Sequence, residues 1–339
     1  MSVIGVLTAG GDCPGLNAVI RGLVMRAEEA YDAEVLGIMN GWEGLMDGDV
    51  HLLGRRDVDD ILAKGGTILG TSRKDPYVHG DGYASVARTI KRNDIDSLVV
   101  IGGDGTLRTA LRLGEDGANV IGVPKTIDND INGTDFTFGF DTAVQIVTDA
   151  IDRLTTTAEA HNRVILVEVM GRTKGWIATY GGLAGGAQAV LIPEVPYDIE
   201  EVSSLIRRRH RRGKNYSVVV VAEGIEPPQK VQLEKDAFGF DRLGGVAYQL
   251  APVIEQLTGY ETRVTVLGHL QRGGTPTAFD RVLGTRFGVH AADLAESGRH
   301  GTMVAMRGAK IEAVPLAVGC SEIRGVDPDL YDVAETFFG

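Results

Sequence analysis

The stretch VIGVLTAGGDCPGLNAVIRGLV, residues 3–24, decides the fold class. Its first part is a short β-branched run, which predicts a buried strand at Val3–Thr8. A glycine loop follows at Ala9–Gly15, and the chain then takes the spacing of an amphipathic helix, expected at Leu16–Ala30. A buried strand that turns through glycines directly into a helix is typical of parallel α/β proteins.

The same alternation of strand and helix continues along most of the 339 residues. Further strands are expected at Glu34–Ile38, Ser97–Ile101, Val120–Val123, Arg163–Val169, Ala189–Ile192, Ser217–Ala222, Arg263–Gly268 and Met303–Met306. Further helices are expected at Asp81–Asn93, Thr142–Ala158, Ile199–Arg212, Gly245–Leu257 and Ala278–Ser297. This order predicts an α/β fold with two doubly wound, mostly parallel sheet lobes. Ligands of such sheets bind beyond the carboxyl ends of the strands, and we expect the active site in the cleft between the lobes.

The composition argues against several classes of protein. The chain has 34 Lys and Arg against 46 Asp and Glu, a net charge of −12, which is unsuited to nucleic acid or an anionic membrane as the main partner. No apolar run approaches the ~20 residues of a membrane-spanning helix. Cys13 and Cys320 are the only cysteines, too few for a disulfide framework, and we therefore expect a cytoplasmic location.

Two glycine-rich loops follow expected strands and open expected helices. The backbone of the first, Thr8–Asn17, is bare enough to approach a phosphate near a helix N-terminus, although it could equally be a structural turn. In the second, Ile101–Thr106, glycines frame Asp104, which could hold Mg²⁺ beside phosphate oxygens or simply cap the helix. Two such loops at strand ends favour a phosphate site over two unrelated turns.

The most informative segment is Pro124-Lys125-Thr126-Ile127-Asp128-Asn129-Asp130. Two carboxylates that lie two residues apart after a strand are costly to bury without a purpose. Close like charges raise the pKa of one carboxylate and suit it to act as a base toward a hydroxyl. The alternative is a solvated turn, which charged loops usually form.

Four motifs together resemble the phosphofructokinase family. GGDCPGLN (residues 10–17), GGDGT (102–106), PKTIDND (124–130) and MGR (170–172) occur in this order. The resemblance extends from about Val3 to Arg307, and TIDND is its most specific element. It implies transfer of a phosphoryl group from Mg²⁺–ATP to the 1-hydroxyl of fructose 6-phosphate, with Asp128 as the base.

The resemblance also implies the other site residues. The donor would be bound by Gly11, Arg73, Lys74, Asp104, Gly105 and Thr106, with Mg²⁺ on Asp104. The sugar would contact Thr126, Asp128, Asp130, Met170, Gly171, Arg172 and Glu223, and its 6-phosphate would contact Arg163, Arg263, His269 and Arg272. In relatives Arg163 and Arg263 come from a neighbouring subunit, which implies a homodimer or homotetramer.

The expected lobes follow from these motifs. Residues 1–139 would bind the donor and residues 140–307 the sugar phosphate, while residues 308–339 would pack back on the first lobe. The chain could cross between the lobes more than once.

Two residues bear on the identity of the phosphoryl donor, and they indicate different donors. The resemblance matches Gly105 to ATP-dependent enzymes and Lys125 to pyrophosphate-dependent ones, a combination similar to the mixed-substrate group. We favour ATP, because room for its α-phosphate is a precondition whereas a lysine can be accommodated. A pyrophosphate-dependent transferase remains the alternative, and a non-catalytic sensor of sugar phosphates or nucleotides is a third reading.

Overall fold

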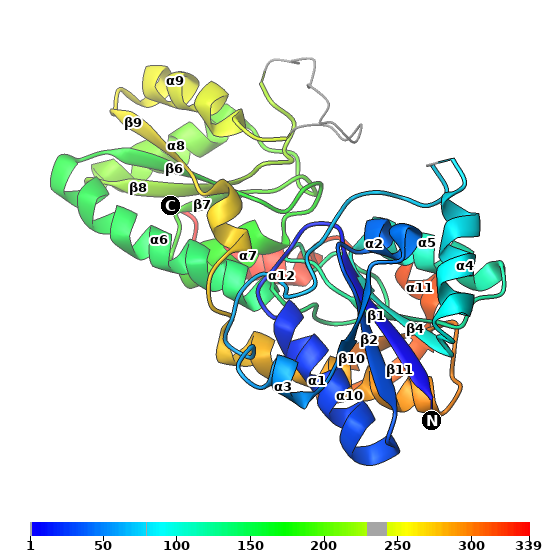
Figure 1. Ribbon diagram of the computed structural model, residues 1–339. Helices are drawn as coiled ribbons and strands as arrows, with labels where there is room; N and C mark the ends of the chain where they lie inside the picture. The colour runs from blue at the N-terminus through cyan, green and yellow to red at the C-terminus, as the bar shows by residue number, and fades with distance from the viewer. Residues whose placement is uncertain (1, 79, 229–242) are drawn as a thin grey trace. The chain divides into compact units, whose positions relative to one another are not determined.

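The computed structural model describes residues 2–78, 80–228 and 243–339, and the chain divides into two compact units (Figure 1). Unit 1 comprises Met1–Thr142 and Arg272–Ile323, and unit 2 comprises Ala143–Gln271 and Arg324–Gly339. The chain therefore passes between the units after residues 142, 271 and 323.

Unit 1 is built on a mostly parallel sheet, whose described strands have the order β11-β10-β5-β4-β1-β2-β3. The five parallel strands are β1 (Val3–Ala9), β2 (Glu34–Ile38), β4 (Ser97–Gly102), β5 (Val120–Pro124) and β10 (Thr302–Arg307). All five were expected from their β-branched runs. The edge strands β3 (Val50–Leu53) and β11 (Lys310–Pro315) pair in the antiparallel sense and were not expected, because they are partly exposed and lack a buried run.

Helices cover both faces of this sheet. They are α1 (Leu16–Tyr31), α2 (Trp42–Asp47), α3 (Arg55–Val58), α4 (Gly82–Arg92), α5 (Asp104–Glu115), α10 (Ala278–Glu296) and α11 (Leu316–Gly319). On one face, strand residues such as Leu7 and Val100 form a core with Leu107 of α5. On the other face lie α1 and α10, side by side in Figure 1. None of the described helices is long and apolar enough to span a membrane.

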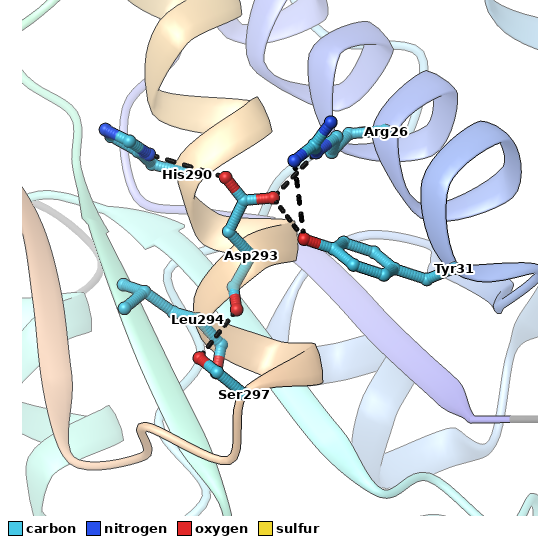
Figure 2. Close-up of polar contacts among 6 residues, drawn as sticks. All are labelled: Arg26, Tyr31, His290, Asp293, Leu294 and Ser297. Carbon is cyan, nitrogen blue, oxygen red and sulfur yellow. Dashed lines mark hydrogen bonds and ion pairs between the residues drawn. The ribbon is translucent and has the colours of Figure 1, made fainter.

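Glycines allow α1 and α10 to pack with their backbones in contact. A Cβ on Gly288 would lie 2.1 Å from the carbonyl oxygen of Val19, and one on Gly22 would lie 2.5 Å from that of Thr285. Figure 2 shows a polar cluster between the same two helices, in which Asp293 of α10 accepts hydrogen bonds from Arg26 Nε and the Tyr31 hydroxyl of α1, both at 2.7 Å. This helix pair joins residues more than 260 positions apart, which is why residues 272–323 belong to unit 1.

Unit 2 contains a parallel sheet with the described strand order β7-β8-β6-β9. The strands are β6 (Val164–Val169), β7 (Ala189–Leu191), β8 (Ser217–Ala222) and β9 (Thr262–Val266). The helices are α6 (Phe140–His161), which begins in unit 1, α7 (Trp176–Ala184), α8 (Ile199–Arg211), α9 (Val246–Thr258), the 3₁₀ helix η1 (Gly268–Arg272) and α12 (Pro328–Glu335). The two sheets, mostly parallel in unit 1 and parallel in unit 2, and their helices confirm the α/β class.

The bounds of the units differ from those expected for the lobes. The first boundary lies at residue 142 and not at 139, because Thr142 bonds to the buried Asp280 of α10 within unit 1. The expected second lobe ended at residue 307, whereas the chain re-enters unit 1 at Arg272. The expected C-terminal segment, 308–339, is also split. Residues 324–339 belong to unit 2, where the Tyr331 hydroxyl donates to the carbonyl of Val190 at 2.8 Å.

Candidate active site

The three motif loops of unit 1 follow the carboxyl ends of the neighbouring strands β1, β4 and β5. Because β1, β4 and β5 are neighbours in register, Ala9, Gly102 and Pro124 lie next to one another where these strands end. The backbone N–H of Lys125 donates to the carbonyl of Gly102 at 2.9 Å. Parallel pairing thus brings together three motifs, of which the first and the third are more than one hundred residues apart in the sequence.

Lys125 lies at the centre of these loops. Its side chain is buried, with 4% of the residue exposed, and its ammonium group donates to the carbonyl of Gly11 in the first loop. Burial lowers the pKa of Lys125, because it disfavours the charged form, and the nearby Arg272 lowers it further. The charges of Asp128 and Asp12 oppose this effect. Cys13 is fully buried, and burial raises the pKa of its thiol, so we interpret it as a packing residue.

Arg272 lies against the first loop. Its Nη1 donates to the carbonyl of Asp12 at 3.3 Å, and a Cβ on Gly11 would lie 2.1 Å from the same nitrogen. Gly11 is therefore required for the approach of this arginine. His269 is exposed and lies three residues before Arg272 in the 3₁₀ helix η1. Three residues make one turn of such a helix, so the expected spacing of one helical turn is present.

Asp104, Gly105 and Thr106 form the first turn of α5. Asp104 Oδ1 accepts a hydrogen bond from Arg108 Nε, one turn further along, at 2.8 Å. A Cβ on Gly105 would meet no atom within 4 Å, so this position faces open space. A carboxylate at a helix N-terminus is stabilised by the helix dipole and can still present its second oxygen to a cation.

Among the described residues, no group of three or more His, Cys, Asp or Glu could hold a metal ion. Mg²⁺ commonly takes one or two carboxylates and completes its six positions with water and substrate phosphates. Asp104 fits a magnesium site of this shared kind, in which a bound donor supplies further ligands.

The TIDND loop is buried and firmly held. Asp128 and Asp130 are 9% and 8% exposed, which argues against a solvated turn. Between them, Asn129 takes a left-handed conformation with φ of 51°, and its side-chain oxygen accepts from the backbone of Thr137 at 2.9 Å. The Asp128 N–H donates to Thr126 Oγ1 at 3.0 Å. Asn129, to which the sequence assigned no role, thus fixes the turn that presents both carboxylates.

Arg73 and Lys74 follow a segment that is bonded to the first loop. Gly10 donates to the carbonyl of Ser72 at 3.0 Å and accepts from Thr71 Oγ1 at 2.6 Å. Lys74 forms an ion pair with Glu43, and this hydrogen bond raises the pKa of the lysine. The structure therefore brings this segment to the first loop.

In unit 2, the MGR motif and Glu223 lie together at the carboxyl ends of β6 and β8. The backbone N–H of Arg172 donates to Glu223 Oε1 at 3.0 Å. Both Gly171 and Arg172 have positive φ, 146° and 55°, and a Cβ on Gly224 would lie 1.9 Å from the carbonyl oxygen of Arg172. The loop Met170–Gly175 is thus a tight turn that presents Met170, Gly171 and Arg172 beside Glu223.

Arg163 and Arg263 lie near the opposite, amino ends of the same sheet. Arg163 immediately precedes β6, and Arg263 lies in β9, where it is paired with Ile165 of β6. Both arginines form ion pairs with Glu261, at 2.8 Å for Arg163, and these contacts lower the pKa of Glu261. A strand rises ~3.3 Å per residue, so the length of β6 separates these arginines from the MGR motif of the same chain.

The fold and these loops define a class: a mostly parallel α/β protein with glycine-rich loops and buried carboxylates at the carboxyl ends of its strands. Within that class the chain belongs to the phosphofructokinase family, whose model matches residues 3–295. It is 53% identical to the pyrophosphate–fructose 6-phosphate 1-phosphotransferase of Amycolatopsis methanolica, over 99% of both chains. It is also 53% identical, over 99% of both chains, to the ATP-dependent 6-phosphofructokinase of Mycobacterium tuberculosis H37Rv.

A solved structure gives the same fold. The crystal structure of Pichia pastoris phosphofructokinase in the T-state superposes with a TM-score of 0.85 at 32% identity, covering 99% of this chain and 38% of that longer chain. Relatives of equal identity are named for two different phosphoryl donors, so overall similarity does not identify the donor of this chain.

Proposed function

We propose that the protein transfers the terminal phosphoryl group of Mg²⁺–ATP to the 1-hydroxyl of fructose 6-phosphate, giving fructose 1,6-bisphosphate and ADP. The observation that carries the proposal is the TIDND loop, which presents two buried carboxylates at the same sheet edge as the glycine-rich loops. Family membership and the names of the relatives support the same reaction.

Each residue has a simple role in this proposal. Asp128 takes the proton of the 1-hydroxyl as the sugar oxygen attacks the terminal phosphorus and the bond to the leaving ADP oxygen breaks. Thr126 and Asp130 lie beside the base, and Arg73, Lys74 and the backbone around Gly11 and Thr106 bind the donor. Mg²⁺ held by Asp104 would neutralise phosphate charge, and positioning accounts for much of the rest of the catalysis.

Sugar recognition is assigned to unit 2 together with Arg272 of unit 1. Met170, Gly171, Arg172 and Glu223 would bind the sugar, and Arg163, Arg263, His269 and Arg272 would bind its 6-phosphate, since arginine forks suit phosphate oxygens. Because Arg163 and Arg263 lie a strand length from the MGR motif, we propose that they serve the site of a neighbouring subunit in a homodimer or homotetramer.

The choice of ATP rests on Gly105 and Lys125. Gly105 faces open space at the first turn of α5, which leaves room for an α-phosphate. The ammonium of Lys125 donates one of its hydrogen bonds to the carbonyl of Gly11, which gives the lysine a structural role besides any contact with the donor. The alternative is pyrophosphate as donor, which the presence of a lysine next to the TIDND loop favours.

The test is the ratio of kcat/KM for ATP and pyrophosphate, measured with Mg²⁺ and saturating fructose 6-phosphate in an assay that follows fructose 1,6-bisphosphate. We expect ATP to be preferred. A preference for pyrophosphate would support the alternative donor, and no product with either donor would overturn the proposed function.

A further inference from the structure

The third passage of the chain between the units differs from the first two. The passages after residues 142 and 271 lie within α6 and η1, whereas Ile323 and Arg324 lie between helices. Ile323 forms an antiparallel bridge with Ile131 in unit 1. The carbonyl of Arg324 accepts from Trp176 Nε1 in unit 2 at 3.0 Å. Since consecutive Cα atoms are ~3.8 Å apart, one peptide bond joins a residue fixed to unit 1 to a residue fixed to unit 2.

The unit 1 end of this segment is attached to the aspartate of α5. Arg108 donates through Nε to Asp104 Oδ1 at 2.8 Å and through Nη2 to the carbonyl of Ser321 at 3.2 Å. Ile131, the bridge partner of Ile323, directly follows Asp130 of the TIDND loop. Two elements assigned to the donor and the base therefore hold the same short stretch of chain.

The unit 2 end is attached to the loop Met170–Gly175. Glu194 accepts from the N–H of Val326 at 3.1 Å, and both of its oxygens accept from the N–H of Gly175, at 3.1 and 3.0 Å. Gly175 ends this loop and caps α7, and the N–H of Lys174 closes the loop on the carbonyl of Gly171 at 3.0 Å. One carboxylate thus holds both the crossing segment and the turn that presents the MGR motif.

We propose that Ser321–Val326 is a coupling segment that makes binding of the phosphoryl donor and of the sugar phosphate interdependent, with Arg108 and Glu194 as the positioning residues at its two ends. This inference rests on the proposed function. A donor that binds at Asp104 alters the pairing of Asp104 with Arg108, and Arg108 transmits the change to the backbone of Ser321. Glu194 transmits it from Val326 to Gly175, and the reverse path follows from thermodynamic reciprocity.

The test is a linkage measurement by isothermal titration calorimetry. The Kd of fructose 6-phosphate is measured alone and with saturating Mg²⁺–AMP-PNP, or Mg²⁺–imidodiphosphate if pyrophosphate proves to be the donor. We expect the two values for the wild type to differ by at least about fivefold, the lower end of typical couplings. In Arg108→Gln and in Glu194→Gln the ratio should fall to within about twofold of one. Because the two changes break one path, the double variant should lose no more coupling than either single variant.

Matched controls separate coupling from general damage. Arg88→Gln on α4 and Glu201→Gln on α8 remove exposed side chains of the same types and should keep the wild-type ratio. Arg108→Lys retains a cation that can pair with one of its two partners, and should give an intermediate ratio. A wild-type ratio within twofold of one, or an unchanged ratio in both glutamine variants, would overturn the coupling segment.

Trp176 provides a second measurement that remains informative if Glu194→Gln folds poorly. The chain has two tryptophans, and Trp42→Phe leaves Trp176, which is bonded to Arg324, as the single tryptophan, whose emission is excited selectively over that of the tyrosines. The donor analogue alone should change its fluorescence, and Arg108→Gln should abolish that change while analogue binding persists. An equal fluorescence change with Arg108→Gln would contradict the proposal. If the wild type turns over fructose 6-phosphate but these tests fail, the coupling is wrong and the proposed function stands.

Discussion

The ammonium group of Lys125 donates a hydrogen bond to the main-chain carbonyl of Gly11, and so links the start of the TIDND loop to the first glycine loop. The lysine is buried and Arg272 lies beside the same glycine. Lys125, which the family resemblance associates with pyrophosphate, therefore also holds two loops of unit 1 together.

Lys125→Met keeps most of the buried volume and removes the charge. If the lysine is only accommodated by an ATP-dependent site, kcat/KM for ATP should stay within about tenfold of wild type, while any pyrophosphate activity falls further. Steady-state kinetics with both donors check this. A collapse of ATP turnover with unchanged thermal stability would show that Lys125 acts on the donor itself.

Gly105→Asp tests the room available to the α-phosphate. The protein leaves open space at this Cβ, and the backbone needs no positive φ, so the variant should fold normally. Its added bulk and negative charge should lower kcat/KM for ATP by about a hundredfold or more, with Gly105→Ala as a smaller, uncharged control. ATP kinetics that match wild type would remove Gly105 as the determinant of the donor.

Arg163→Ala and Arg263→Ala should each raise the KM for fructose 6-phosphate by about tenfold to a hundredfold, because each removes a charge-assisted phosphate contact. At a fructose 6-phosphate concentration near the wild-type KM, hybrid oligomers of Arg263→Ala and Asp128→Asn subunits should be more active than either parent, since one kind of site then has both residues intact. Absence of recovery in verified hybrids would place each complete site within one chain.

Asp280 gives unit 1 a pH-dependent stability. Burial raises the pKa of this carboxyl to about 6, although Thr142 donates to it through its N–H and its hydroxyl. Because the folded pKa lies above the unfolded value of 3.8, its contribution is full below that value and is lost as the pH rises through about 6. Relative to Asp280→Asn, the wild type should lose about 2 kcal/mol of unfolding free energy between pH 4 and 7. Urea titrations check this. The exposed control Asp60→Asn should have the same pH dependence of unfolding free energy as the wild type. If Asp280→Asn also has the wild-type pH dependence, the raised pKa of Asp280 is wrong.

Short sequence patterns were sufficient to predict the buried strands and the loops that follow them. The buried β-branched strands, such as β4 and β6, and the loops at their carboxyl ends were found from sequence, because parallel strands buried on both faces leave a clear hydrophobic run. By contrast, the helix α7 was not predicted, because it contains Gly181 and Gly182, which are poor helix formers. Both glycines are needed for packing, since a Cβ on either would lie 2.5 Å from a valine side chain.

The residues that the sequence did not reveal act through long-range contacts. Glu194 bonds to Val326, 132 positions away, and no spacing in the sequence indicates this. Arg108 could have been noticed, since it lies four residues after Asp104 on one helix face. Residues 272–323 return to unit 1 because α10 packs on α1, a contact that depends on glycines whose role is visible only in three dimensions.

The central claim is that Asp128 takes the proton of the acceptor hydroxyl, and the kcat of Asp128→Asn tests it most directly. Measured at saturating fructose 6-phosphate and donor, this kcat should fall by ~10²–10⁴-fold, because a general base acts chiefly in the transition state. The calorimetric Kd of fructose 6-phosphate should change by less than about threefold, since binding does not require the base. A variant that keeps near-wild-type kcat would contradict the account.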